Sequence, residues 1–223
     1  MKFSGQLRRA LAGLLLSAVP ALVHAQLGAM ACGSLDNHYG PFDYRRSSAA
    51  NLELVEGTHF TPAVENLIKG NTSLGPGGDL TYTLNVFPNH HRALMSMMKL
   101  ALREKRSRPT ESQRTMECWF DRGERYAPDD AMVKIIHGLY LTKTGKPAEA
   151  RDKLDEARAL GLMDANAYYN LGLGYFDLQQ YDKALESAHA AYAQGFPLPG
   201  LRDKLRRAGK WKDPAPEAHS GVN

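Results

Sequence analysis

The sequence contains none of the short motifs that mark the common classes of enzyme. It has no Gly-x-Ser-x-Gly nucleophile elbow, no phosphate-binding loop, no zincin motif and no Cys-x-x-Cys pair. Side chains capable of acid–base chemistry occur near the N-terminus without an organising spacing: His38, His59, His90 and His91 with Asp36, Asp43, Tyr39, Tyr44 and Glu56. We therefore predict a protein that is not an enzyme and binds no cofactor. An enzyme centred on this segment is an alternative, which a pocket gathering His38, His59 and His90 would favour.

The sequence also lacks a hydrophobic run long enough to cross a membrane as a helix. The apolar run near the N-terminus, Ala10 to Val23, is shorter than the roughly 20 residues that a span needs, and it contains a proline. It follows Lys2, Arg8 and Arg9 and ends in small residues at Ala25, which is the layout of a secretory signal peptide. We predict that residues 1–25 are removed on export to the periplasm.

Neither sign of charge dominates the predicted mature chain. Removal of residues 1–25 takes away three bases and no acid, which leaves 25 bases against 24 acids. Two basic stretches, Lys99 to Arg114 and Arg202 to Lys212, alternate with acids or leucines, as solvated helix faces do. We therefore expect no nucleic acid as a partner.

Cysteine is scarce, since the chain contains only Cys32 and Cys118. In an oxidising compartment the default for such a pair is a disulfide, and closing a loop of 86 residues stabilises a fold by roughly 4 to 5 kcal/mol. Cys32 also lies a few residues past the apolar run, where bacterial lipoproteins carry their lipid, although Ala29 stands where such sites usually have leucine. A lipid anchor at Cys32 is therefore an alternative.

The second half of the chain contains a helical pattern that repeats after 34 positions, because Ala131 to Asp164 aligns with the residues from Ala165 onward. Small residues stand where paired helices must approach closely, and large ones stand where hairpins must fill the space between them. Gly145 and Pro147 suit the turn of the first copy. The pattern resembles the tetratricopeptide repeat family at these positions: Gly138, Ala150, Ala157, Tyr168, Leu171, Gly172, Tyr175, Ala184 and Ala191.

The resemblance implies a mainly α fold over residues 89–212, with about three helical hairpins. The first hairpin is divergent: His90 to Lys105 would pair with a helix that a capping box at Thr110 to Gln113 opens and that ends before Pro128. Leu201 to Ala208 is expected to form a C-terminal capping helix, because its leucines are four apart and its other residues are mostly charged. Residues 213–223 are expected to be a flexible tail.

Residues 26–88 have a different composition and are expected to form a small mixed α+β segment. Alternating apolar and polar residues predict strands at Leu52 to Val55 and Leu80 to Phe87. Thr61-Pro62 predicts the start of a short helix that reaches Ile68.

In the family that the repeats resemble, the first helices of successive hairpins line a concave surface that binds protein partners. The equivalent positions here are mostly apolar: Met132, Ile135, Leu139, Thr142, Lys143, Asn166, Tyr169, Leu173, Phe176 and Asp177. The Lys and Asn clamp with which some members hold a terminal carboxylate is absent from those positions, so a hydrophobic or helical ligand is expected. The resemblance thus implies a non-catalytic periplasmic scaffold or adaptor. Alternatively, these residues pack on the capping helix or on the N-terminal segment.

A periplasmic metal-handling protein is the other alternative function. Imidazole and thioether groups suit copper, and His90, His91 and Met95 lie close together in the sequence. Adjacent histidines point about 100° apart on a helix, so at most one can join a methionine three or four positions on. Asn89 is expected to cap this helix, and its methionines are more typical of a core. We therefore predict no metal site.

Overall fold

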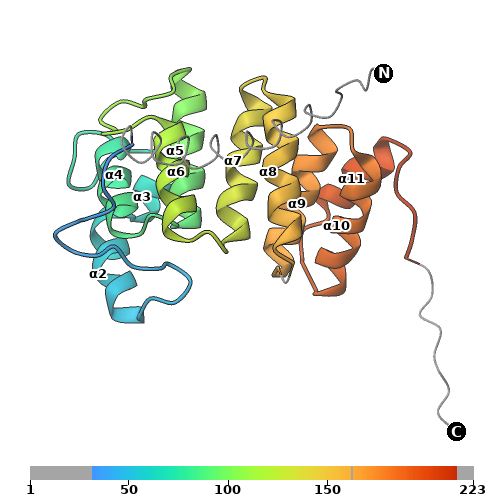
Figure 1. Cartoon of the computed structure of the whole chain (residues 1–223), viewed down its shortest axis with the longest axis horizontal. Helices are drawn as coiled ribbons and strands as arrows, with labels where there is room; N and C mark the ends of the chain where they lie inside the picture. Colours follow the sequence, from blue (N-terminus) through green and yellow to red (C-terminus); the bar gives the residue numbers. More distant parts are fainter. Residues whose placement is uncertain (1–31, 162, 215–223) are drawn as a thin grey trace, which may run out of the picture.

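A computed structural model describes residues 32–161 and 163–214 of the chain. Over these residues it contains ten helices and no strand, so the protein is mainly α as predicted. Figure 1 shows the helices side by side in a row that ends at α11. None of the helices described is long and apolar enough to cross a membrane. The predicted signal peptide and residues 215–223 of the predicted tail lie outside the described residues.

Four helices of equal length form the clearest part of the row. They are α7 (Ala131–Lys143), α8 (Pro147–Ala159), α9 (Ala165–Asp177) and α10 (Tyr181–Ala193). Helices α7 and α9 start 34 positions apart, as do α8 and α10, so the sequence period is also a structural one. Helix α7 packs on α8, α9 packs on α10, and α7 also contacts α9.

Local chemistry sets where these helices begin and end. The carboxylates of Asp130 and Asp164 accept hydrogen bonds from backbone N–H groups in the first turns of α7 and α9. Gly145 follows α7 in the left-handed region, with φ of +79°, and Pro147 occupies the first turn of α8. The turn predicted at Gly145 and Pro147 is confirmed.

Small residues allow the paired helices to approach each other. A Cβ on Gly138 would lie 2.8 Å from Cδ2 of Leu154, and one on Gly172 would lie 2.5 Å from Cδ2 of Leu201. Of the residues that the repeat pattern singled out, only Tyr168 is partly exposed; these are buried: Gly138, Ala150, Ala157, Leu171, Gly172, Tyr175, Ala184 and Ala191. They therefore belong to the packing of the row and not to its surface.

The predicted C-terminal helix is confirmed as α11 (Gly200–Arg207). Leu201 and Leu205 are fully buried against the row, and α11 contacts both α9 and α10. The other side of α11 is charged, so the helix closes the apolar end of the row.

The N-terminal half is also helical. It contains α4 (Pro76–Val86), α5 (His91–Glu104) and α6 (Met116–Tyr126). Helices α4 and α6 have 11 residues each and begin 40 positions apart, and α5 and α7 also begin 40 positions apart. These two helix starts are thus spaced more widely than the 34 positions of the second half.

The two predicted strands are wrong, because Leu80 to Phe87 falls in α4 and at its end, and Leu52 to Val55 lies in α2 (Ala49–His59). Leu80 and Leu84 are four residues apart and fully buried, while Tyr82 between them is 40% exposed. This arrangement satisfies both a strand and a helix pattern, and the packing of α4 on α5 selects the helix.

Two further predictions of helix bounds need correction. Helix α3 (Pro62–Glu65) begins at Pro62 as predicted but ends three residues before Ile68, since Leu67 has a positive φ of 58°. The residues from Thr110 to Gln113 form a loop, and Thr115 caps α6 by accepting a hydrogen bond from the Cys118 N–H group.

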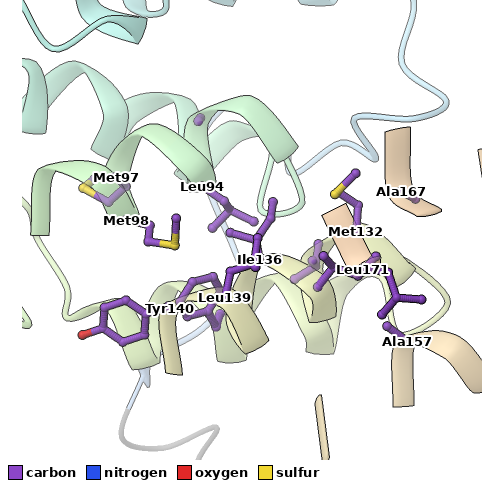
Figure 2. Packing of buried hydrophobic residues seen from close by; sticks show 14 of the residues in the cluster. Leu94, Met97, Met98, Met132, Ile136, Leu139, Tyr140, Ala157, Ala167 and Leu171 are labelled. Carbon is purple, nitrogen blue, oxygen red and sulfur yellow. The ribbon is translucent and has the colours of Figure 1, made fainter. Parts of the chain in front are cut away.

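One hydrophobic core runs through the row, from Phe60 to Leu205. Figure 2 shows Leu94 and Met98 of α5 facing Ile136 and Leu139 of α7. Residues on both sides of position 88 belong to this core, because α3 and α4 pack on α5, while α2 packs on α4.

The cysteines form the predicted disulfide, with the Cα atoms of Cys32 and Cys118 5.0 Å apart. Three arginines of the α6 region hold the same segment by its backbone, since Arg114, Arg125 and Arg122 donate to the carbonyl oxygens of residues 32, 33 and 34 respectively. Because Sγ of Cys32 is bonded to Cys118, it is not free to carry a thioether-linked lipid. The lipid-anchor alternative is thus incompatible with this structure.

We expect the double variant Cys32→Ser/Cys118→Ser to lose about 2 to 5 kcal/mol of unfolding free energy, because the disulfide restricts the unfolded chain over a long loop. Urea unfolding followed by circular dichroism would measure this loss. Reduction of the wild-type protein should lower its stability by the same amount as the substitution, and an unchanged midpoint in either case would contradict the expectation.

Two glycines, one packed closely in α4 and one with open space around it in α2, test the packing of α4. A Cβ on Gly77 would overlap the carbonyl oxygen of Thr110, whereas one on Gly57, inside α2, would meet nothing within 4 Å. We expect Gly77→Ala to destabilise the fold by at least about 1 kcal/mol. Gly57→Ala should stabilise it by about 0.5 to 1 kcal/mol, because alanine is the better helix former. Thermal unfolding of both variants tests the pair, and the same sign of change in both would be inconsistent with it.

Candidate functional site

The residues predicted to line a groove do not share one surface. On α7, Met132, Ile135 and Leu139 are buried in the core under α5. On α9, Tyr169 stacks on Phe196 at 4.2 Å between ring centroids. Phe196 lies in the loop between α10 and α11, so this loop covers part of the predicted surface.

The remaining groove residues are held by neighbouring helices. The ammonium group of Lys204 in α11 lies 5.0 Å from the centre of the Phe176 ring. Asp177 pairs with Lys143 of α7, with 2.8 Å between Oδ2 and Nζ, and with Lys204 at 3.7 Å. Leu173 is partly buried against the core, and the Thr142 hydroxyl donates to the Gly138 carbonyl oxygen. Of the ten predicted groove residues, Met132 and Asn166 are the two that line the pocket described next.

A small pocket of about 180 Å³ lies on the face that α5, α7 and α9 share. Its apolar lining comes from Met95 on α5 and from Met132 and Ile136 on α7. Asn166 and Asn170 border it on α9, where the Asn170 side chain donates to the Asn166 carbonyl oxygen at 2.8 Å. Residues from three successive helix pairs thus meet at one hollow.

The rim of this pocket on the α5 side is charged. Arg92 forms an ion pair with Glu65 of α3, with 2.8 Å between Nε and Oε1, and this pair lowers the pKa of Glu65. Lys99 also lines the pocket and forms no ion pair within the described part of the chain. The hollow therefore combines an apolar floor with one uncompensated positive charge.

A larger hollow of about 500 Å³ lies between α8 and α10, but its charged groups already satisfy one another. Arg158 pairs with Glu186 at 2.7 Å, and Lys183 pairs with Asp155 at 2.6 Å. A ligand there would have to replace these ion pairs. The pocket on α5, α7 and α9 is the better candidate.

Beside the pocket on α5, α7 and α9, a buried network of hydrogen bonds joins the N-terminal segment to the row of helices. Asn89 is fully buried; it accepts from the Tyr44 N–H group and donates to Asp43 at 2.8 Å and Asp130 at 2.9 Å. His91 donates from Nε2 to the same Asp130 carboxylate at 2.8 Å. Hydrogen bonds from Arg45 hold the pKa of Asp43 well below its usual range. Asn89 is thus a connector and not the helix cap that was predicted.

The cap of α5 is instead His90. Its Nδ1 atom accepts a hydrogen bond from the Ala93 N–H group, and its Nε2 atom donates to Glu56 at 3.0 Å. The ring is fully buried and stacks on Tyr44. Both ring nitrogens of His90, and Nε2 of His91, are therefore engaged within the protein, which leaves neither residue well placed to bind a metal with Met95.

The acid–base candidates of the N-terminal segment lie in separate environments. His59 donates from Nδ1 to the buried Asp79 at 2.9 Å and stacks on Tyr82. His38 is exposed, as is Asp36, and the Tyr39 hydroxyl donates to Asn51. His38, His59 and His90 thus have different neighbours, and no shared pocket of the kind that would favour an enzyme is among the hollows described above.

Sequence reasoning missed six lining residues: Glu65, Arg92, Ser96, Lys99, Ile136 and Asn170. The repeat alignment placed Ile135 at the surface, but both Ile135 and Ile136 are buried, and it is Ile136 that lines the pocket. Asn166 and Asn170 are four positions apart, as are Met132 and Ile136, and this spacing was the available signal.

No protein-family model, curated protein or solved structure matches this chain. The site is therefore interpreted from its own geometry.

The capping role of His90 gives a pH dependence. Burial lowers the pKa of His90, so below about pH 6.5 the unfolded chain binds a proton that the folded chain does not. The free energy of unfolding should therefore fall as the pH decreases from 6.5, by at most about 1.4 kcal/mol per pH unit from this group. Above pH 6.5 this residue should have no effect.

The comparison is with His90→Asn, which keeps a side chain able to cap α5 but does not titrate. Urea unfolding at several pH values between about 5 and 7 should give a shallower dependence for the variant than for the wild type. Parallel curves would show that His90 does not contribute.

Proposed function

We propose that the protein is an exported, non-catalytic binding protein of the tetratricopeptide repeat type. Support comes from the 34-residue period shared by sequence and helices, and from the glycines and alanines buried where the helices cross. The Cys32–Cys118 disulfide is compatible with an oxidising compartment such as the periplasm. The proposed site of binding is the pocket on α5, α7 and α9.

The small volume of the pocket favours a protein partner over a small molecule. Pockets for small molecules and cofactors measure about 300 to 1,000 Å³, whereas this one measures about 180 Å³. A hollow of that size suits one side chain of a larger partner, and a buried anchor of this kind supplies much of the affinity of an interface. The protein would therefore act as a scaffold or adaptor.

The chemistry of the pocket indicates which side chain it would take. Met95 and Met132 are flexible and polarizable, so the floor can adapt to differently shaped apolar groups. Lys99 at the rim favours a neighbouring carboxylate. We propose that the partner presents an aliphatic or methionine side chain next to an acidic residue.

A random peptide library displayed on phage and selected on the oxidised chain from residue 26 tests this. We expect the enriched peptides to share an apolar residue next to Asp or Glu. Met95→Lys should weaken their binding at least about tenfold, because it places an ammonium group in the apolar floor. Fluorescence anisotropy of a labelled peptide measures the affinity.

Leu160→Lys is the matched control, since it introduces the same charge at a partly exposed leucine beyond α8. This variant should bind the selected peptides as the wild type does, and circular dichroism should show that both variants are folded. Equal binding by the Met95 variant and the wild type would remove this pocket from the proposed function.

A further inference from the structure

The C-terminal end of the row carries a concentrated positive charge. Residues 200–212 contain a single acid, Asp203, and six bases: Arg202, Lys204, Arg206, Arg207, Lys210 and Lys212. We call these six bases the cap patch. Among the described residues, only Lys204 of the patch lies within 4 Å of a carboxylate, that of Asp177. The charge of the patch is therefore almost entirely uncompensated.

Aromatic rings, and not carboxylates, hold most of the cap patch in place. Four of the six bases lie over a ring, at 5.0 to 5.8 Å from its centre: Arg202 over Tyr192, Lys204 over Phe176, Arg206 over Trp211 and Lys210 over Tyr181. A ring attracts a cation through its quadrupole and does not neutralise its charge. These side chains are thus ordered while their positive field stays available to a partner.

Apolar groups border the cap patch. Leu198 is 56% exposed and stands between Pro197 and Pro199, which are also exposed. Trp211 is partly exposed at the other end of the segment. Figure 1 shows α11 at the end of the row, so a broad surface could approach it without meeting the other helices.

We propose that the cap patch docks the protein on an anionic lipid bilayer. The four exposed bases, Arg206, Arg207, Lys210 and Lys212, would lie among the phosphate groups of the headgroups, and Leu198 would enter the interfacial layer. Arginine suits this contact, because a guanidinium that lies on a ring keeps its in-plane N–H donors free for phosphate oxygens.

Two observations favour a bilayer over other polyanions. Single-stranded nucleic acids are bound by stacking bases on free aromatic faces, whereas here Tyr192, Phe176 and Trp211 each have one of the chain's own cations over the ring. The exposed Leu198 would gain nothing from a purely charged polymer such as an acidic peptide, but it would gain from the acyl boundary of a bilayer.

The test is sedimentation of the oxidised chain from residue 26 with vesicles. One set contains phosphatidylcholine with about one third phosphatidylglycerol, and the other contains phosphatidylcholine alone. We expect binding to the anionic vesicles only, with a decrease of at least about tenfold between 50 and 500 mM salt, because exposed charges are screened.

Two triple variants with the same change of net charge distinguish an effect of the cap patch from an effect of the total charge. Arg206→Glu/Arg207→Glu/Lys210→Glu changes the patch, and Arg103→Glu/Lys105→Glu/Arg106→Glu makes the same change at exposed bases on and after α5. The first should reduce binding to anionic vesicles by at least about a hundredfold, and the second by less than about threefold. Leu198→Asn should weaken binding severalfold more at high salt than Leu54→Asn, which changes an exposed leucine on α2.

Circular dichroism confirms that each variant is folded. Equal losses in the two triple variants would overturn the proposal, since they would reduce the effect to net charge. Absence of binding to anionic vesicles would also overturn it. So would tighter binding to soluble poly-glutamate or to an oligonucleotide than to the vesicles, because the patch would then serve an acidic polypeptide or a nucleic acid.

Discussion

Each helix pair in this protein can bury its apolar side only against the next pair. This constraint explains why one core continues from Phe60 to Leu205 and why the crossings need glycine. At Gly138 and Gly172 the neighbouring leucines lie within 2.8 Å of the position of a Cβ, so the close approach of the helices requires the absence of a side chain. The last helix pair has no further pair to cover its apolar side. Helix α11 covers that side with two buried leucines and exposes its charged side.

The N-terminal segment is attached to this row by three kinds of contact. The disulfide and three arginines fix residues 32 to 34 on α6, and aromatic rings around Phe87 cover the end of α4. Asn89 then joins Asp43 to Asp130, which begins α7. A buried polar side chain must satisfy all its hydrogen bonds, and Asn89 does so only when both segments are in place. The segment is thus an integral part of the fold.

The two proposed surfaces follow from where charge is left uncompensated. Most acids lie close to bases, as Glu124 does between His137, Lys134 and Lys153, and these pairs hold neighbouring helices together. Lys99 at the pocket and five of the six bases of the cap patch are among the described bases that form no ion pair. A charge without a partner in the fold costs little at a surface, and it stays free to attract a ligand. Binding to a polypeptide and to a bilayer would then use different parts of the row.

The sequence by itself determined the helical hairpins of the second half, the closing helix and the disulfide. Local sequence signals were sufficient there. The 34-residue period, with its cap and turn residues, defines the helices, and a chain with two cysteines allows only one disulfide within the chain. Only the tertiary structure decided that α2 and α4 are helices, since the spacing of Leu80, Tyr82 and Leu84 fits a strand as well as a helix until α5 packs on one side. It also decided which residues of α7 and α9 line the pocket. Ile135 and Ile136 are chemically alike and both buried, and the packing of α5 and α9 on α7 decides that Ile136 is the one that lines the pocket.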